Sequence, residues 1–420
     1  MSRTKKQKKT SAKKLGLKMK WVKEGNFPVE VVQATLHNAY VILYRHPLYA
    51  NRIWFNEFDN NIYITIDGKE TALEDYHLYG IVIKLTELYD VNFSSGVIYE
   101  ATQMVARLNK RDPLKDYIEA IQLNPEQKKN PILDTWLIRF FGVEDSPLHR
   151  AYSRKFAIGA LARALYSTVE NPIKQDCTLI LYAAQGKKKS TAIKELSLFT
   201  KWFSDIPFDM GNNKEACLKI AGKFLYELKE LAKRRAKDKE IEKAFLDTMI
   251  DRYRPPYGKV TISRPRRTSF IGTTNRLDIL QDSSGSRRFW PVVCCDGWDK
   301  DRTIDVEGIK KHALQIWAEA LQAYKAGDSW WLNTTEEEAR VKEAQHFASY
   351  HPWKDEIKCY LAAANQQDIT PKGVMNHLDL PRNLQTKSNL TTIEMIMQEL
   401  GYLRRRIKIN GKKVTKWRKE

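Results

Sequence analysis

The sequence predicts an α/β protein whose central domain is flanked by a helical N-terminal domain and a small C-terminal domain. Three observations predict this organisation. Short apolar runs alternate with helical stretches between residues 150 and 330, as in parallel α/β domains. Helical periodicity dominates residues 28–130, and three helical stretches followed by a hairpin signal make up the last 70 residues.

Composition restricts the class of protein. The chain has 420 residues, of which 42% are hydrophobic and 11% aromatic, so it can form several folded domains. It contains no apolar run of about 18 residues and begins without the apolar region of a secretory signal, so we expect neither membrane insertion nor secretion. The five cysteines show no zinc or disulfide spacing, which is typical of a protein in the reducing cytoplasm.

The charge distribution indicates a polyanionic partner. The formal net charge is +20, and residues 1–20 carry nine basic side chains but no acidic one. Residues 401–420 carry nine basic side chains and one acidic one. Such charge at both ends of a folded protein predicts a nucleic acid as partner. Tails that only confer solubility are the alternative.

The N-terminal third is expected to be a tail followed by helices. Residues 1–27 are predicted to form a disordered basic tail, because Lys-rich sequence cannot bury a core. Residues 28–150 are predicted to form a helical domain that serves oligomerisation, with helical stretches at 29–44, 97–108 and 133–166. The spacing of a buried helix face is shown by Trp136, Leu137, Phe140 and Phe141.

Residues 151–345 are predicted to be the α/β domain. Its expected strands are the apolar runs at 177–182, 224–226, 269–273 and 289–294. Its expected helices lie at 190–199 and 306–325. Thr335 and Glu338 have the spacing of a capping box, which predicts the start of a further helix.

Residues 346–420 are predicted to form a winged-helix domain. Helices are expected at 353–363, from Pro371 after the N-cap Thr370, and at 391–400. Asn410-Gly411 is a strong hairpin signal between two basic strands. The arrangement is used mainly on DNA, with a protein-interaction module of the same fold as the alternative. The hairpin side chains expected to contact DNA include Arg404, Arg405, Arg406, Lys412 and Lys413.

The loop after the first core strand carries the main chemical motif. Residues 183–191 match the phosphate-binding pattern G-x-x-x-x-G-K-S/T at Lys189 and Ser190, whereas Ala183 and Lys188 replace its glycines. A strand before the loop and a helix after it place free backbone N–H groups where phosphates bind. Lys189 would then contact the β- and γ-phosphates and Ser190 would ligate magnesium. A Lys-rich loop that caps a helix explains the sequence equally well.

Three further features follow in the order of a nucleotide-hydrolysing site. Glu227 follows an apolar run, and Glu230 lies one helical turn later. Either carboxylate is a candidate to activate water or to hold magnesium. The alternative is that both lie on a solvated helix rich in Glu and Lys. Asn275 ends the next apolar run, where it could orient the attacking water. Arg287 and Arg288 precede the last strand and are candidates for an arginine finger supplied to a neighbouring subunit.

These motifs together resemble the virulence-associated protein E family over roughly residues 30–340. The segments that carry the resemblance are Trp136-Leu137, Gln185-Gly186, Lys189-Ser190-Thr191, Glu227 with Glu230, 251–254 with 256–258, 272–275, and Gly285 with 287–291. The family comprises ATPases of phages, prophages and genomic islands that are similar to superfamily 3 helicases. The resemblance implies an AAA+-like P-loop core that hydrolyses ATP with Mg²⁺ in a hexameric ring and moves on DNA when a mobile element is replicated.

The resemblance also implies roles for individual residues. The nucleotide site it implies consists of Gln185, Gly186, Lys187, Lys188, Lys189, Ser190 and Thr191. It implies magnesium binding by Ser190 and Glu227, catalytic roles for Glu227 and Glu230, a sensor role for Asn275, and a finger at Arg287 or Arg288. Lys188 replaces a glycine that eases the loop turn, and a non-glycine residue with positive φ costs roughly 1 kcal/mol. Because no catalytic carboxylate cluster or zinc motif precedes the core, we expect no priming activity.

Ring helicases of this type place a DNA-gripping hairpin between the acidic motif and the sensor. By position, the candidates for backbone contacts are Lys259, Arg264, Arg266 and Arg267. The expected partners are therefore single- and double-stranded DNA and further copies of the chain. One alternative is a sequence-specific DNA-binding protein whose nucleotide site is inactive. The other is an ATPase that remodels protein or serves defence independently of DNA.

Overall fold

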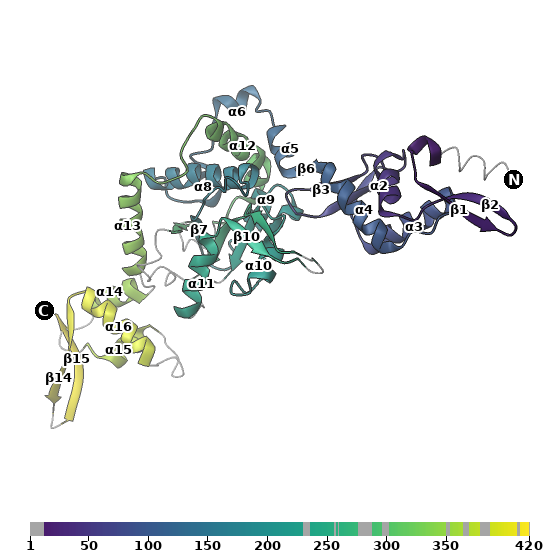
Figure 1. Ribbon diagram of the computed structural model, residues 1–420. Coiled ribbons are helices and arrows are strands. Elements are labelled where there is room, and N and C mark those ends of the chain that lie inside the picture. Colours follow the sequence, from purple (N-terminus) through teal and green to yellow (C-terminus); the bar gives the residue numbers. More distant parts are fainter. Residues whose placement is uncertain are drawn as a thin grey trace.

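A computed structural model of the chain shows three units in a row (Figure 1). The structure describes residues 12–229, 236–255, 258, 260–275, 288–295, 302–349, 353–363, 369–378, 387–409 and 412–419. An N-terminal unit is joined to the central unit near β6 and α5, and helix α13 leads from the central unit to the C-terminal unit. No helix in the described part of the chain is long and apolar enough to cross a membrane.

The N-terminal unit is a mixture of strands and helices. Its elements are β1 (Met19–Glu24), β2 (Phe27–Val32), α2 (Leu36–Arg45), β3 (Ile53–Asn56), β4 (Ile62–Ile66), β5 (Lys69–Ala72), α3 (Asp75–Tyr89), α4 (Ser95–Leu108) and β6 (Lys110–Arg111). β1 and β2 form a hairpin, and the other strands form a sheet in the order β5-β4-β3-β6. Helices α2 and α4 pack against each other beside β3.

Two predictions for this unit are wrong. The predicted disordered tail 1–27 is ordered from residue 12, since Ala12 and Leu17 are buried in the core of the unit and β1 is paired with β2. The predicted helical domain contains a sheet, because its β-branched and aromatic segments pair across turns. Asp67 and Gly68 both have positive φ and close the β4–β5 turn, as expected for an Asp-Gly hairpin signal. The predicted helix at 97–108 is confirmed as α4.

The central unit contains a five-stranded parallel sheet, which confirms the predicted α/β class. Its strands are β7 (Thr178–Tyr182), β8 (Phe203–Ser204), β9 (Leu225–Lys229), β12 (Ser269–Thr274) and β13 (Phe289–Val293). They lie in the order β13-β7-β12-β9-β8, with every neighbouring pair parallel. The four longer strands overlap the four predicted runs, although β9 continues three residues beyond the run predicted at 224–226. Because β12 lies between β7 and β9, the carboxyl ends of these three strands are adjacent at one edge of the sheet.

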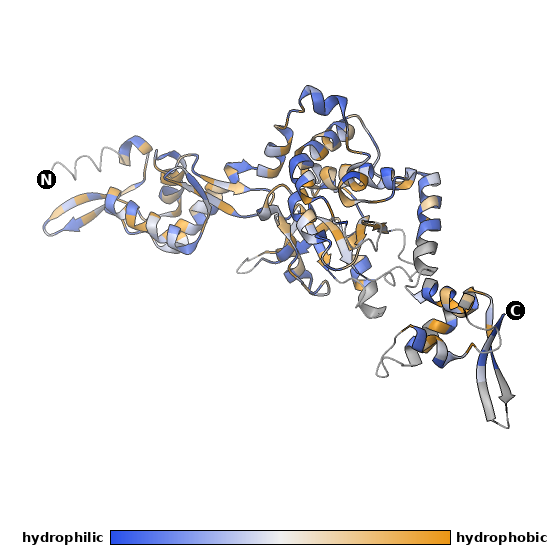
Figure 2. Ribbon diagram, turned by 180° about the vertical axis from the view of Figure 1, so that it is seen from behind, coloured by the Kyte–Doolittle hydropathy of each residue, from blue (hydrophilic) through white to orange (hydrophobic). Residues whose placement is uncertain are grey.

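Helices cover both faces of this sheet. The helices are α5 (Pro113–Glu119), α6 (Pro125–Lys129), α7 (Trp136–Phe141), α8 (Pro147–Tyr166), α9 (Lys189–Leu196), α10 (Asn213–Ile220), α11 (Ala236–Asp247) and α12 (Val306–Lys325). Leu179 and Leu181 are buried in one cluster with residues of α8, α9 and α12. Ile180 points to the opposite face and packs with residues of α10 and α11. Figure 2 shows apolar residues concentrated on the central strands, inside the more hydrophilic surrounding helices.

Helices α7 and α8 belong to the core of the central unit. The four residues predicted to form a buried face of α7 are buried: Trp136, Leu137, Phe140 and Phe141. They share a cluster with the apolar face of the sheet. The predicted domain boundary at residue 150 lies inside α8. A hairpin of β10 (Ile250–Tyr253) and β11 (Ile262–Pro265) is inserted between α11 and the sheet strand β12.

The C-terminal unit has the predicted element order. Helix α13 (Thr334–Ser349) leads to α14 (Trp353–Ala363), α15 (Pro371–His377), α16 (Lys387–Glu399) and a hairpin of β14 (Tyr402–Ile409) and β15 (Lys412–Lys419). The N-cap Thr370 accepts a hydrogen bond from Gly373, as predicted. The capping box of α13 is formed by Asn333 and Glu336, so its prediction at Thr335 and Glu338 is wrong by two residues.

Candidate functional site

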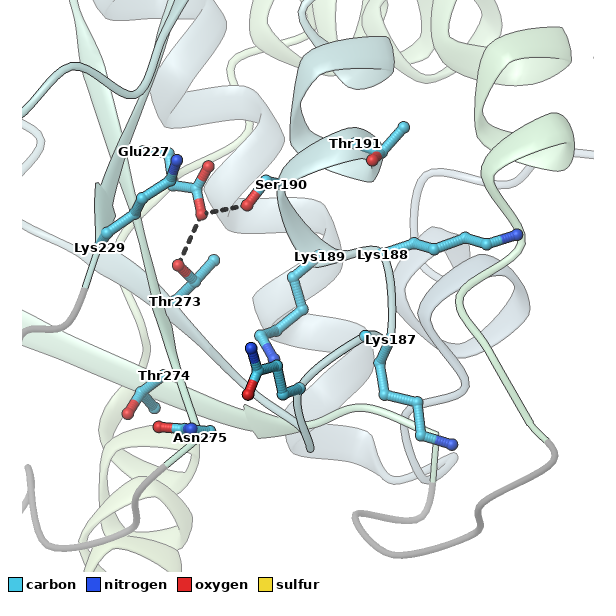
Figure 3. A pocket seen from close by; sticks show the side chains of 12 residues that line it. Lys187, Lys188, Lys189, Ser190, Thr191, Glu227, Lys229, Thr273, Thr274 and Asn275 are labelled. Carbon is cyan, nitrogen blue, oxygen red and sulfur yellow. Dashed lines mark hydrogen bonds between the residues drawn. The ribbon is translucent and has the colours of Figure 1, made fainter.

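A cavity of about 580 Å³ opens at the carboxyl edge of the parallel sheet (Figure 3). It is lined by the loop after β7, the first turn of α9, and the ends of β9 and β12. The lining residues are Gln185, Gly186, Lys187, Lys188, Lys189, Ser190, Thr191, Glu227, Lys229, Thr273, Thr274 and Asn275. All seven loop residues predicted for a nucleotide site therefore line one cavity, together with Glu227 and Asn275.

The loop between β7 and α9 turns through two residues with positive φ. Gly186 has φ 87° and Lys188 has φ 63°, so Lys188 adopts the left-handed conformation that its place in the motif implied. No atom of the described residues lies within 4 Å of the position that a Cβ atom on Gly186 would occupy, so they leave open space beside the loop backbone. Lys188 is the N-cap residue of α9, and its side chain makes no capping hydrogen bond.

The Lys189 side chain lies over its own loop. Its Nζ donates to the carbonyl oxygens of Ala183 at 2.7 Å and Ala184 at 3.1 Å. Burial lowers the pKa of the Lys189 ammonium, and the nearby Glu227 carboxylate partly opposes that effect. A partly desolvated ammonium at the start of a helix attracts an anion more strongly than one in water does.

Glu227 is the buried carboxylate of the cavity. It is 2% exposed and lies in β9. The hydroxyl of Ser190 donates to its Oε1 at 2.7 Å, and the hydroxyl of Thr273 donates to the same oxygen at 2.6 Å (Figure 3). The other oxygen, Oε2, is buried and has no hydrogen-bond partner among the residues that the structure describes. A buried carboxylate oxygen without a donor is costly unless a cation or a donor from a ligand reaches it.

The end of β12 completes the wall opposite the loop. The carbonyl of Thr274 accepts a hydrogen bond from the backbone N–H of Ala183 at 3.3 Å, which fixes the loop start against β12. Asn275 follows directly and lines the cavity, as predicted. Lys229, at the end of β9, forms an ion pair with Asp205 and also lines the cavity.

The other residues predicted to take part in catalysis are Glu230, Arg287 and Arg288. Glu230 and Arg287 lie outside the described residues. Arg288 forms a two-bond ion pair with Asp247 of α11, at 2.7 Å from Nε and 2.5 Å from Nη2. Hydrogen bonding to Asp247 raises the pKa of Arg288. Within this subunit the Arg288 guanidinium is thus held by α11 and does not line the cavity.

Two of the predicted DNA contacts are wrong. Arg266 is 1% exposed, because its guanidinium pairs with Asp251 at 2.5 Å and donates to the Phe245 carbonyl. Arg267 is largely buried and bonds Asp112 and the Ala164 carbonyl, both at 2.5 Å. These two arginines hold β11 and its neighbours together, so they cannot contact a DNA backbone. Lys259 lies outside the described residues.

The remaining residues predicted to contact DNA lie in β11 and in the C-terminal hairpin. Arg264 is half-buried in β11 beside the N-terminal unit, with its guanidinium over Phe55. On the C-terminal hairpin, Arg404 pairs with Glu394 of α16 and Arg405 is exposed. The structure places Arg406, Lys412 and Lys413 in the hairpin strands but does not describe their side chains.

The sequence reasoning missed Thr273 and Lys229 as site residues. Thr273 belongs to the run 272–275, from which only Asn275 was assigned a role. A polar residue inside an otherwise apolar strand was the available signal, since a buried hydroxyl requires a hydrogen-bond partner. No comparable signal marked Lys229, because lysine is common after a strand.

The family model for the virulence-associated protein E-like domain matches residues 121–349, which is more than half of the chain. The chain therefore belongs to the family of proteins with this domain, as the motifs indicated. No curated protein matches the sequence significantly. Among solved structures, an apo structure of the NrS-1 C-terminal region matches with a TM-score of 0.41 and 13% identity, covering 86% of this chain and 94% of that chain. The A form of the same region matches with a TM-score of 0.40 and 12% identity, covering 91% and 99%.

Proposed function

We propose that this chain is a magnesium-dependent ATPase of a phage or mobile genetic element that moves on DNA as a replicative helicase. The observation that carries the proposal is the contact between Ser190 and Glu227, which lie 37 positions apart in sequence and meet at 2.7 Å in the cavity. A serine at the start of a helix, an adjacent lysine and a strand carboxylate are the parts that P-loop ATPases use to hold Mg-nucleotide.

The residues present fit a magnesium ion and a triphosphate. In the described part of the chain no donor reaches the buried Glu227 Oε2, and the Ser190 hydroxyl is bonded to the same carboxylate, so two oxygen ligands already lie together. Backbone N–H groups at the start of α9 are available to phosphate oxygens, and the open space at Gly186 lets a phosphate approach the loop. Bound magnesium would neutralise charge on the β- and γ-phosphates.

The chain's own residues then have separate roles. Lys189 exchanges its loop carbonyls for phosphate oxygens and so compensates their charge. Thr273 holds the Glu227 carboxylate in place by a hydrogen bond. Asn275, and Glu230 outside the described residues, are the proposed groups that orient and activate the attacking water. Because Glu227 already contacts Ser190, we assign it to the metal.

The proposed assembly is a ring, with six subunits expected from the family resemblance. ATP would lie between subunits, so that Arg287 or Arg288 of one subunit reaches the phosphates bound by its neighbour. For Arg288, this role requires release from Asp247. The proposal therefore includes a change at the end of α11 when subunits assemble.

DNA is the proposed track, and two features support it. The chain has a formal net charge of +20, concentrated at both ends. Three helices followed by the β14–β15 hairpin have the order of a winged-helix domain, which we propose positions the ring on double-stranded DNA. A single strand would then pass through the ring.

A second candidate function is a DNA-binding protein whose nucleotide site does not turn over. Two features of the loop favour it. The Lys189 ammonium is bonded to the carbonyls of Ala183 and Ala184 and must leave them to contact a phosphate. The turn also holds a lysine, Lys188, in the left-handed conformation, where the motif has glycine. Slow or absent hydrolysis with intact ATP binding would support this candidate. DNA-independent hydrolysis would instead support an ATPase that remodels protein or serves defence.

The direct test is nucleotide binding and hydrolysis with matched lysine variants. Lys189 and Lys194 lie on the same helix, but only Lys189 lines the cavity. We expect Lys189→Ala to weaken binding of a fluorescent ATP analogue and to abolish magnesium-dependent turnover, and Lys194→Ala to leave both unchanged. Equal behaviour of the two variants would overturn the assignment of the cavity.

A further inference from the structure

Two arginines from different units meet at one buried aromatic ring. Arg107 lies in the last turn of α4, in the N-terminal unit, and Arg264 lies in β11 of the central unit. Their Cζ atoms lie 4.8 Å and 5.4 Å from the centroid of the Phe55 ring. Phe55 is 2% exposed, so both guanidinium groups contact a ring that is otherwise buried.

Neither arginine has an ion pair or a hydrogen bond within the described parts of the chain. Arginines close to them in sequence are paired: Arg266 with Asp251, Arg267 with Asp112, and Arg111 with Glu70. The Nε atom of Arg264 is buried and has no acceptor among the described residues. The carboxylate of Glu57 interacts with Arg264 only at longer range and pairs with Lys110 at 3.1 Å.

This arrangement is electrostatically unfavourable without an anion. Burial lowers the pKa of Arg264, and the positive charge of Arg107 lowers it further. Two like charges beside a buried ring, with a buried donor unsatisfied, cost free energy that contact with the ring offsets only in part. An oxyanion placed between the guanidinium groups would remove the repulsion and supply the missing acceptor.

We infer that Arg107 and Arg264 together bind a backbone phosphate of single-stranded DNA. This inference rests on the proposed function, which supplies a DNA strand as partner. Guanidinium groups match phosphate oxygens in geometry and charge, and contact with the Phe55 ring limits the movement of both side chains. Because the two arginines belong to different units, the bound phosphate would also fasten the N-terminal unit to the β10–β11 hairpin.

The test uses the full-length chain and a fluorescein-labelled oligothymidylate, with binding followed by fluorescence anisotropy over a series of salt concentrations. Arg107 is exposed, so Arg107→Gln should fold, and Arg264→Lys keeps the charge of the half-buried site. Arg111→Gln is the matched control, because Arg111 also stacks on an aromatic ring, Trp54, at 4.9 Å but is paired with Glu70.

We expect Arg107→Gln to weaken DNA binding about tenfold. We also expect it to reduce the slope of log K against log salt by about 0.7, the value for one lost phosphate contact on a single strand. Arg264→Lys should weaken binding in the same direction, and Arg111→Gln should change neither quantity. Without DNA, Arg107→Gln should leave the thermal midpoint unchanged or raise it, because it removes a like-charge repulsion.

Different outcomes separate the failure of this inference from that of the proposed function. If the wild-type chain binds the oligonucleotide but Arg107→Gln behaves like Arg111→Gln, the phosphate site is wrong and the proposed function stands. A lower thermal midpoint together with unchanged DNA binding would mean that Arg107 only packs on Phe55. If the wild-type chain does not bind DNA, the proposed function fails, and the phosphate site with it.

Discussion

Replacement of Lys188 by glycine is predicted to stabilise the central unit. Lys188 has φ 63° and ψ 23°, and its side chain is exposed and makes no capping hydrogen bond, so its removal sacrifices no contact that the structure describes. In Figure 3 the side chain extends away from Glu227 and Ser190. Lys188→Gly therefore changes mainly the cost of the left-handed backbone conformation.

The magnitude follows from two opposing contributions. The left-handed conformation costs a non-glycine residue roughly 1–2 kcal/mol. Glycine loses about 0.5–1 kcal/mol more backbone entropy on folding than alanine does. The net gain is about 0.5–1 kcal/mol, which corresponds to roughly 1–4 °C in the thermal midpoint of a domain of this size.

Thermal unfolding of three variants measures this effect. Lys188→Ala keeps a Cβ atom in the same backbone conformation, so we expect its midpoint to equal that of the wild type. Lys194→Gly lies inside the same helix, where glycine costs about 1 kcal/mol, so we expect a lower midpoint. If Lys188→Gly lowers the midpoint as Lys194→Gly does, the left-handed conformation of Lys188 is not a source of strain and the reasoning is refuted.

Three further predictions concern other parts of the central unit. His149 Nε2 lies 3.0 Å from the Glu343 carboxylate, and His149 Nδ1 lies 2.8 Å from the Glu144 carbonyl oxygen. Burial alone would lower the pKa of His149, but these two acceptors raise it above the ordinary 6.5. Stability from the protonated form is thus complete below about pH 6.5 and is lost as pH rises through the raised pKa, so His149→Gln should lower the thermal midpoint at pH 6 but not at pH 9. An equal loss at both values would contradict this. Arg266→Met should lower the free energy of unfolding, measured in urea, by about 3–5 kcal/mol, because it leaves the Asp251 carboxylate buried and unpaired. The control Arg252→Met, at an exposed neighbouring position, should change the free energy of unfolding by less than about 0.5 kcal/mol. Similar effects of the two variants would show that the buried pair contributes little. Glu227→Gln should reduce ATP turnover roughly 10- to 100-fold while retaining the fold, because it removes a charge from the proposed magnesium site; single-turnover hydrolysis and circular dichroism measure both. Turnover within twofold of the wild type would remove Glu227 from the mechanism.

The core strands were predictable because each is a continuous apolar run. β7 is buried at all five positions and is covered on both faces, which produces a run without alternation. β8 was missed because Phe203–Ser204 is too short to show any periodicity. The N-terminal sheet was not predicted because its strands are short and are flanked by helical stretches, so that the Asp67-Gly68 turn is the main local signal for it.

The candidate site was predictable where chemistry and chain order agree. Lys189, Ser190 and Glu227 have residue types that the chemistry requires, in the order in which parallel strands deliver them to one edge. The buried arginines were not predictable, because a sequence shows charge but not the partner. Asp112 lies far before Arg267 in the chain, and only the fold brings them together. The same holds for Arg107 and Arg264, which meet across two units.

Steady-state ATP hydrolysis with magnesium, in the presence and absence of single-stranded DNA, tests the central proposal most directly. We predict turnover that DNA stimulates, that Lys189→Ala abolishes and that Lys194→Ala leaves unchanged. Absence of hydrolysis by the wild-type chain under all conditions, or turnover that Lys189→Ala does not affect, would contradict the account of this cavity as the site of an ATP-driven motor.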